Sequence, residues 1–296
     1  MGSRSAAVLL ALAVAGSTTV AGPIGHGGDQ AEVLEAAPLA DQLVGRPTKS
    51  AGFPYADRAQ RAESRYGDRS PYLGGARILL RQGTSDSYTV CSAGMPVRGR
   101  DGTEYMLTAG HCAPSNRGQH TAATGYVSRG SSGPEVTVVA TMGPVTASSF
   151  VRGSRTPHDD LALIRTSTSK GVWHGSSRRP TQIKRLAGFR AVKPGTMVCH
   201  GGASTGRSCS WRVERMDVTV RYGEGGGRYS YVGGLVMARR VGPAVLRDGD
   251  SGGPVYGWTS SGRAYGYGVV SGGSGADWLL FTPVARAVDR WGLRAS

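Results

Sequence analysis

The stretch Gly-Asp-Ser-Gly-Gly-Pro at residues 249–254 places a serine between glycines. A serine hydroxyl can act as a nucleophile when it is exposed and when backbone N–H groups point to the place where an oxyanion forms. Glycine permits the backbone conformations that aim such groups, and we assign the two donors to Gly249 and Ser251. A tight turn without chemistry is the alternative for this stretch alone, because 47 of the 296 residues are glycine.

A nucleophilic serine needs a base that removes its proton. Of the six histidines, His111 is the best candidate, because it follows the strand-like stretch 105–108 and because a bond at Cys112 would hold it in place. A single histidine is more often a surface or core residue, but together with residues 249–254 a catalytic role is favoured.

A neutral imidazole in this role needs a buried carboxylate that fixes its tautomer and stabilises the imidazolium. Asp159 and Asp160 both precede the apolar stretch 161–164. Asp160 lies directly at the start of the expected buried strand, whereas Asp159 is one step further into the loop and is expected to be solvated. We therefore choose Asp160. The order His, Asp, Ser differs from that of subtilisin-like enzymes and of α/β-hydrolases.

The elements that must position these residues are short strands. Apolar or alternating stretches separated by Gly, Ser, Pro and Asn predict them, since a half-buried strand alternates and turns use these residues; examples are 105–108, 135–142, 161–166, 217–222 and 265–271. The high glycine content excludes a helical bundle or a coiled coil. Within the strand-rich part of the chain we expect a helix only at 281–293, where apolar residues recur at helical spacing. Before it, the stretches 30–37 and 55–66 are also compatible with helix.

Residues 1–21 have the pattern of a secretory signal, with Arg4 before an apolar stretch at 6–15 and small residues at 19–21. A membrane-tethered start is the alternative, but the apolar stretch is shorter than the roughly 20 residues that span a bilayer. We therefore expect a secreted, extracellular protein that is not embedded in a membrane after signal removal.

Four cysteines in an exported chain indicate two disulfides with three possible pairings. Their order along the sequence favours Cys91–Cys112 and Cys199–Cys209, each of which closes a short loop. The absence of a CxxC motif argues against a zinc ribbon or a thioredoxin-type site.

The formal charge of +15 lies entirely after residue 72, because the seven Lys/Arg and seven Asp/Glu before Leu73 cancel. Most of the cations are arginines spread along the chain, which is typical of a solvated surface. An anionic surface or polymer is a possible partner for such a field. We expect no specificity for nucleic acid.

The order of His111, Asp160 and Ser251 in their motifs resembles the chymotrypsin-fold (trypsin-like) serine peptidases, and more closely the secreted bacterial branch of the streptogrisins and α-lytic protease. The matching segments are Thr-Ala-Gly-His-Cys at 108–112, Asp-Leu-Ala-Leu-Ile-Arg at 160–165, the stretch 249–254, Ser-Gly-Gly-Ser-Gly at 271–275, and the loop 199–209 between two cysteines. The resemblance covers about residues 73–296.

This resemblance implies an all-β protein of two packed six-stranded antiparallel β-barrels with a C-terminal helix. The first barrel would span about 73–170, the second about 190–280 and the helix about 281–293. Residues 22–72 would be a pro-segment that is removed after export, so that the serine peptidase domain is 73–296. The active site would lie between the barrels.

The resemblance also implies roles for single residues. Cys91–Cys112 would be the disulfide beside the catalytic histidine, and Ser271, Gly272 and Gly273 would bind substrate as an edge strand that pairs with its backbone. The bacterial branch usually has a cysteine pair around residues 271–273, which this chain lacks. The shape of the primary specificity pocket is therefore not carried over from the resemblance.

The expected floor of that pocket, residues 243–245, is apolar, so we expect cleavage after apolar residues, with Asp248 as a rival that would recruit basic substrates. His200 stands where the branch usually has an arginine that pairs with the aspartate before the catalytic serine. Either Asp250 has another partner, or a protonated His200 pairs with it, and activity or stability would then weaken as pH rises.

The sequence thus predicts a secreted serine endopeptidase that forms an acyl-enzyme through His111, Asp160 and Ser251, without metal or other cofactor. The alternative from another class is a basic binding protein on the same scaffold without proteolysis. An esterase with the same triad is a third interpretation.

Overall fold

In the computed structural model of the chain, the described residues are 33–36, 43–44, 65–82, 88–130, 133–176, 179–183, 185–224, 228–273 and 277–296. All of them belong to one compact unit that begins at Ala31. The predicted export signal and most of the predicted pro-segment, including 55–64, lie outside the described residues. No helix among the described residues is both long and apolar enough to cross a bilayer.

The first barrel is built from antiparallel strands early in the chain. They are β4 (Arg77–Gln82), β5 (Tyr88–Ser92), β6 (Pro96–Arg98), β7 (Glu104–Thr108), β8 (His120–Gly130), β9 (Gly133–Ser148) and β10 (Ala162–Arg165). The pairing runs β6–β7–β10–β9–β8–β4–β5. Because only three residues join β5 to β6, these two count as one bent strand, and the ring of six strands closes on itself.

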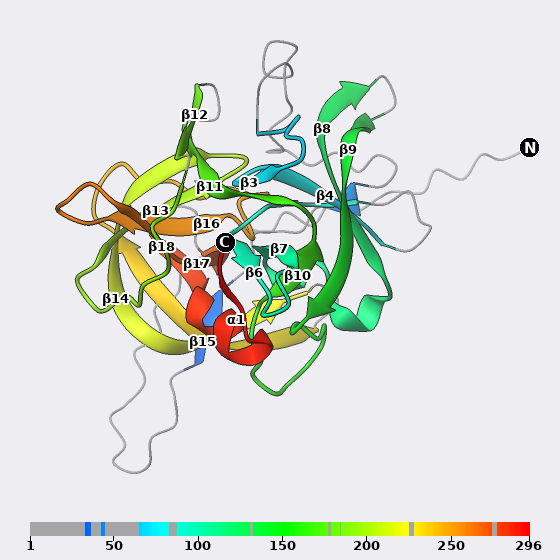
Figure 1. Cartoon of the computed structure of the whole chain (residues 1–296). Coiled ribbons are helices and arrows are strands. Elements are labelled where there is room, and N and C mark those ends of the chain that lie inside the picture. Colours follow the sequence, from blue (N-terminus) through cyan, green and yellow to red (C-terminus); the bar gives the residue numbers. More distant parts are fainter. Residues whose placement is uncertain are drawn as a thin grey trace, which may run out of the picture. The chain divides into compact units, whose positions relative to one another are not determined.

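The second barrel follows in the C-terminal half, as the yellow-green to red strands of Figure 1 show. Its strands are β13 (Met197–Gly202), β14 (Gly206–Gly223), β15 (Tyr229–Arg240), β16 (Pro254–Trp258), β17 (Ala264–Gly273) and β18 (Trp278–Pro283). They pair in the order β14–β13–β16–β17–β18–β15, and β15 returns to β14, so the barrel is closed. The predicted fold of two six-stranded antiparallel barrels is therefore confirmed. Four of the five stretches quoted above as examples of strands lie within strands, and the fifth, 161–166, contains β10 and one residue on each side of it.

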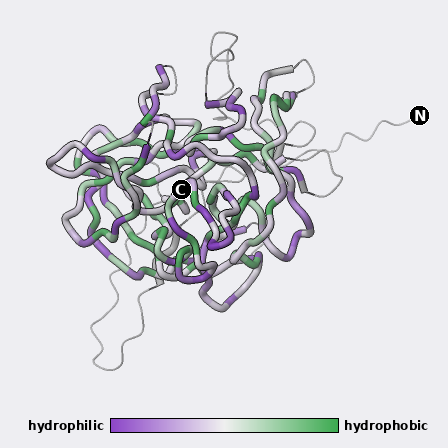
Figure 2. Tube along the Cα trace, viewed as in Figure 1, coloured by the Kyte–Doolittle hydropathy of each residue, from purple (hydrophilic) through white to green (hydrophobic). Residues whose placement is uncertain are grey.

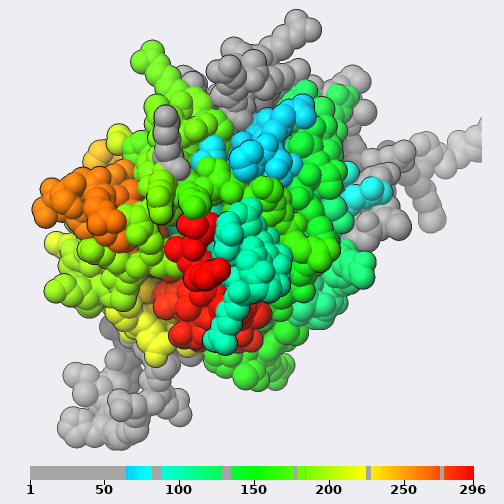
Figure 3. Space-filling view, in the orientation of Figure 1, coloured from blue at the N-terminus to red at the C-terminus, as the bar shows by residue number. Residues whose placement is uncertain are grey.

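Smaller elements complete the fold. A three-stranded sheet contains β3 (Tyr72–Gly74), β11 (Thr168–Gly175) and β12 (Pro180–Ile183), and the last strand β19 (Arg294–Ala295) pairs with β6. In Figure 3 the red C-terminal residues lie against the teal residues of that strand. Two strands from the predicted pro-segment add to the sheets: β1 (Val33–Ala36) runs parallel to β14, and β2 (Leu43–Val44) is antiparallel to β5. The helix predicted at 30–37 is therefore wrong, because its middle forms a strand.

The C-terminal helix α1 spans Val284–Trp291. It begins three residues later than predicted, since Phe281 pairs with β15 and β17 as part of β18. Gly292 ends the helix in the left-handed conformation with φ 63°, which glycine adopts without strain.

Each barrel has an apolar interior, and a third apolar cluster joins the two. Leu107 and Leu163 of the first barrel pack in this shared cluster with Tyr256 and Val269 of the second and with Ala287 of α1. Figure 2 shows the apolar residues, in green, interspersed with polar ones along the strands, as half-buried strands require. The contact between the barrels is therefore a continuous core, and it holds the residues at their interface in fixed positions.

Residues 65–72, which the sequence assigned to the pro-segment, are packed into the fold. Asp68 Oδ2 accepts hydrogen bonds from Leu73 N (2.9 Å) and Trp173 Nε1 (3.2 Å), and Thr124 Oγ1 donates to Asp68 O (2.7 Å). Arg65 is 0% exposed and Tyr66 2%.

Candidate active site

His111 lies on a short 3-10 turn, Gly110–Cys112, directly after β7. The turn is tied to β5 by the disulfide Cys91–Cys112, one of the two predicted pairs, and the structure contains the other, Cys199–Cys209, as well. The imidazole of His111 stands edge-to-face with Phe150 at 6.1 Å and with Tyr222 at 6.4 Å between ring centroids. Covalent and aromatic contacts thus fix both the backbone and the ring of this histidine.

Asp160 is fully buried two residues before β10 and binds His111 twice. The His111 backbone N–H donates to Oδ1 and the His111 Nδ1–H to Oδ2, each at 2.7 Å. An ionised carboxylate only accepts hydrogen bonds, so it fixes the tautomer with the proton on Nδ1 and leaves Nε2 as the basic nitrogen.

The same carboxylate receives a third hydrogen bond, from Ser271 Oγ to Oδ2 at 2.5 Å. Since the single hydroxyl proton of Ser271 is used there, the 2.9 Å contact between Tyr222 and Ser271 must be donated by Tyr222. Burial and the charge of Asp160 raise the pKa of Tyr222, which keeps this donor protonated. Sequence patterning places Tyr222 in a half-buried strand but gives no sign of this contact.

The pKa of Asp160 is lowered. Burial alone would raise it, but the charge of a protonated His111 and the hydrogen bonds from His111 and Ser271 stabilise the carboxylate more strongly. The group is therefore ionised at neutral and mildly acidic pH.

Asp159 does not compete for this position, but the expected reason is wrong. It is 4% exposed rather than solvated, and it forms ion pairs with Arg286 and with Arg290 (2.9 Å) of α1. The two neighbouring aspartates therefore have different partners: Asp160 binds His111, and Asp159 binds the C-terminal helix.

Ser251 comes from the second barrel and lies at its contact with the first. Its carbonyl accepts from Ser92 N of β5 at 2.7 Å. The next residue, Gly252, is so close to the first barrel that a Cβ there would lie 2.1 Å from Thr108 Oγ1 and 2.9 Å from Ala109 N. These two residues are three and two positions before His111. The structure thus brings the three sequence-predicted residues to one place.

The side chain of Ser251 differs from expectation in its exposure, because the residue is only 1% exposed. Within the part of the chain that the structure describes, its hydroxyl has no hydrogen-bond partner. Hydrogen bonds between nucleophile and base are often long without substrate and tighten in the reactive complex.

The loop around Ser251 leaves two amides unused. The N–H groups of Asp250, Gly252 and Gly253 all donate to backbone carbonyls, whereas those of Gly249 and Ser251 have no acceptor among the described residues. Gly249 has φ +85°, which side-chain-bearing residues rarely adopt. The two free amides are the ones to which the sequence assigned the oxyanion.

The carboxylate of Asp250 is bound by backbone groups and one hydroxyl. It accepts from Ser204 N (3.0 Å), Thr205 N (2.9 Å), Thr205 Oγ1 (2.5 Å) and Arg247 N (2.9 Å). His200 does not bind it: His200 Nε2 lies 2.8 Å from Val245 O.

Burial lowers the pKa of His200, an effect that the charge of Asp250 opposes. Of the two alternatives, the structure favours other partners for Asp250 over a protonated His200.

Residues 271–273 end β17 beyond the reach of β16. The β16–β17 pairing stops at Val269, and Gly252 and Gly253 exchange hydrogen bonds with Val270. On the other side Gly272 and Gly273 pair with β18. One edge of this segment is therefore left without a strand partner in the described part of the chain, as a backbone-binding rail requires.

The expected pocket floor differs in detail from the structure. Pro243 and Val245 are exposed, and the buried residues of this stretch are Ala244 and Leu246, which belong to the apolar core of the second barrel. A Cβ at Gly273 would lie 2.6 Å from Leu246 Cδ2, so Leu246 borders the rail. Sequence reasoning missed Leu246, because it stopped at Val245.

One group of metal-type ligands lies close together among the described residues, namely Cys91, His111 and Cys112. Its sulfurs form a disulfide and offer no thiolate, so the group does not favour a metal ion.

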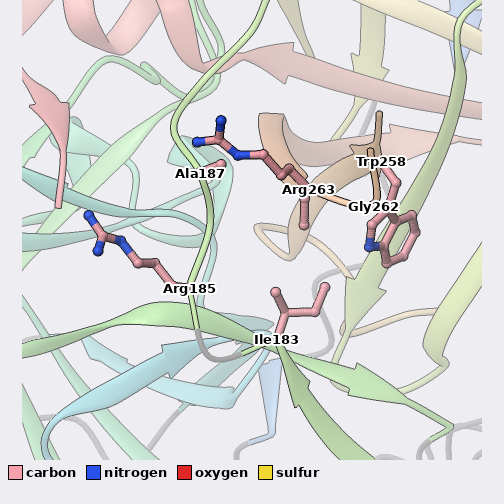
Figure 4. A pocket seen from close by; sticks show the side chains of 7 residues that line it. Ile183, Arg185, Ala187, Trp258, Gly262 and Arg263 are labelled. Carbon is pink, nitrogen blue, oxygen red and sulfur yellow. The ribbon is translucent and has the colours of Figure 1, made fainter. Parts of the chain in front are cut away.

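A separate hollow of about 450 Å³ opens near β12 and β16 (Figure 4). Its walls carry two arginines, Arg185 and Arg263, beside Trp258. None of the triad candidates lines it.

The comparisons with known proteins agree with this geometry. The trypsin family model matches residues 98–290. Serine protease 2 of Streptomyces fradiae is 30% identical over 191 residues, which are 62% of this chain and 87% of that protein.

Two solved structures share the fold. The chymotrypsin of Cellulomonas bogoriensis is 25% identical with a TM-score of 0.50, over 76% of this chain and 97% of that one. A glutamic acid specific serine protease, described as using a histidine triad in substrate binding, is 23% identical with a TM-score of 0.53, over 76% of this chain and all of that one.

Proposed function

The chain belongs to the trypsin family of serine-type endopeptidases, and we propose that it cleaves peptide bonds through an acyl-enzyme on Ser251. The observation that carries this proposal is the doubly hydrogen-bonded pair of His111 and Asp160 beside a loop with two unused amides. A binding protein that uses this fold without proteolysis does not require this arrangement.

In the proposed reaction, His111 Nε2 takes the hydroxyl proton as Ser251 Oγ attacks the substrate carbonyl. Asp160 holds the Nδ1–H and stabilises the imidazolium that forms. The amides of Gly249 and Ser251 bind the oxyanion, and one such donor lowers the barrier by about 3–4 kcal/mol. His111 then protonates the leaving amine, and water hydrolyses the acyl-enzyme by the same steps.

We further propose an apolar preference at the residue before the cut bond. The buried side chains next to the rail, Ala244 and Leu246, are apolar. A neighbour in fold is named as specific for glutamic acid through histidines, but here burial lowers the pKa of His200, the histidine that contacts this stretch. A neutral His200 offers no positive charge to an acidic substrate.

Export and activation by cleavage complete the proposal. The pattern of residues 1–21 supports a secretory signal, and the two disulfides fit an oxidising compartment. We propose that a pro-segment follows the signal and is removed during maturation.

Mass spectrometry of the secreted protein with and without a sulfonyl fluoride tests the function. We expect one adduct per chain, located on Ser251 and absent in Ser251→Ala and in His111→Ala. Hydrolysis of a peptide amide by the same preparation separates a peptidase from an esterase. A correctly trimmed wild-type chain that takes no label would contradict the proposal and would favour the basic binding protein.

A further inference from the structure

The side chain of Arg65 is fully buried and binds four backbone carbonyls. Its Nη1 donates to Gly202 O at 2.9 Å and to Gly201 O at 3.4 Å, and its Nη2 donates to His174 O at 3.0 Å and to Gly175 O at 3.3 Å. A buried guanidinium is costly unless its donors are used, so this contact is a specific one. It joins a segment before the first barrel to the end of β13.

Tyr66 extends the same contact. It forms a small buried cluster with Ala203, the residue after Gly202, and the guanidinium of Arg77 lies 4.0 Å from the centre of its ring. The backbone N–H of Arg77 donates to Arg65 O at 2.6 Å. The pair Arg65–Tyr66 thus packs against residues 201–203 of the loop 201–205.

That loop is the one that holds Asp250. Gly202 lies directly on the carboxylate, because a Cβ there would be 2.3 Å from Asp250 Oδ1. Three of the four hydrogen bonds to the carboxylate come from Ser204 and Thr205. The position of loop 201–205 therefore determines where Asp250 lies.

A second connection leads from the loop to the nucleophile. Ala203 N donates to Ser92 Oγ at 2.8 Å, and Ser92 Oγ donates to Gly249 O at 2.7 Å. The backbone N–H of Ser92 binds Ser251 O at 2.7 Å. The orientation of the peptide groups on both sides of Asp250 is thus coupled to loop 201–205.

Electrostatics favour the same arrangement. Asp250 makes no direct ion pair among the described residues, and burial keeps His200 neutral at physiological pH. Burial lowers the pKa of both Arg65 and Arg77, whereas the negative charge of Asp250 opposes that shift. The negative charge of Asp250 thus favours the charged form of both guanidiniums, although neither forms a direct ion pair with it.

We propose that Arg65 is a positioning residue for the oxyanion-binding loop and that maturation therefore cuts the chain before Arg65 rather than at Leu73. The proposal rests on the active site proposed above. A cut at Leu73 would remove Arg65 and Tyr66, leaving four carbonyls without their donor and Ala203 without its cover. The active enzyme would keep residues 65–72 as an N-terminal arm.

Steady-state kinetics of Arg65→Met, Arg65→Lys and Arg69→Met test this role. Arg65→Met removes the charge and all four hydrogen bonds, so we expect kcat on a peptide amide to fall at least tenfold with KM changed less than threefold. Arg65→Lys should recover part of kcat. Arg69 is an exposed arginine of the same segment, and Arg69→Met should match the wild type.

The N-terminus of the active secreted enzyme, read from its intact mass, provides a second test that does not depend on the folding of a variant. We expect it at or before Arg65. An active enzyme that begins at Leu73, or an Arg65→Met variant with wild-type kcat, would overturn the proposal. If the wild type itself takes no label on Ser251, the proposed function fails instead, so the two failures are distinguishable.

Discussion

His200 and Asp250 lie close to each other in the core, yet they do not form an ion pair: the imidazole is neutral, and the carboxylate is bound by other groups. Each has its own partners: the imidazole uses the carbonyl of Val245, and the carboxylate uses three backbone amides and a hydroxyl. The arginine that the resembled branch usually has in place of His200 pairs with this aspartate. Here Arg65, from a distant part of the chain, binds the carbonyls of Gly201 and Gly202 in the neighbouring loop instead.

The lowered pKa of His200 predicts a stability loss on acidification. Free histidine titrates near pH 6.5, so between that value and the lower native pKa the unfolded state binds more protons and stability falls as pH falls. This is the opposite of the sign expected for a protonated His200. Urea unfolding in a Ser251→Ala background should show a decrease from pH 7 to pH 5 that is smaller in His200→Gln. Equal slopes in both proteins would contradict a buried neutral His200.

We expect Leu246 to limit the size of the proposed specificity pocket, because its Cδ2 would lie 2.6 Å from a Cβ at Gly273. Leu246→Ala should raise kcat/KM for a substrate with Phe before the cut bond by about tenfold relative to one with Ala. It should also cost about 2–4 kcal/mol of unfolding free energy, as large-to-small core changes do. Paired chromogenic peptides measure the ratio. Val245→Ala, in the same stretch but 39% exposed, serves as the control and should leave the ratio unchanged.

At the scale of elements, α1 is connected to the segment before β10 that carries the proposed catalytic carboxylate. Asp159 binds Arg286 and Arg290 of the helix, and Asp160 follows it directly. The helix thereby holds the chain in place directly before Asp160.

Asp159→Asn should therefore destabilise the fold and lower activity together. We expect a loss of about 1–3 kcal/mol in urea unfolding, between the values for exposed and for broken buried ion pairs, because both arginines are more than a third exposed. Asp289→Asn on the exposed face of the same helix is the matched control. A variant at 159 that is as stable as this control would show that the ion pairs contribute little.

The sequence was sufficient for the strands, and it selected the three triad candidates, because both steps depend on local patterns. The alternating and apolar stretches predicted strands, and short motifs placed His111, Asp160 and Ser251 in an order that few folds share. The helix at 30–37 failed because pairing with β14 outweighs a weak local helix preference. Asp159 failed because its partners lie 127 and 131 residues away along the chain, and no local pattern reports such a contact.

At the scale of the whole molecule, the two barrels share one apolar cluster and exchange hydrogen bonds at the site. Ser92 of the first barrel binds Gly249 and Ser251 of the second, while Ser271 of the second binds Asp160 of the first. Neither barrel holds a complete site alone, so the site exists only when both have folded and docked.

We expect the net charge of +15 to act at this same scale, on the approach of substrate rather than on the chemical step. A positive field attracts acidic chains and is screened beyond about 10 Å at 0.1 M salt. For a peptide with several glutamates far from the cut bond, kcat/KM should fall about tenfold between low and high salt, whereas a neutral peptide with the same residues around the bond should change little. The kcat of both should stay constant, because salt does not reach the buried pair of His111 and Asp160. An equal response of the two peptides would show that the basic surface does not steer substrates. Retention of the Ser251→Ala protein on an anionic polymer would then test whether the basic surface binds such polymers instead.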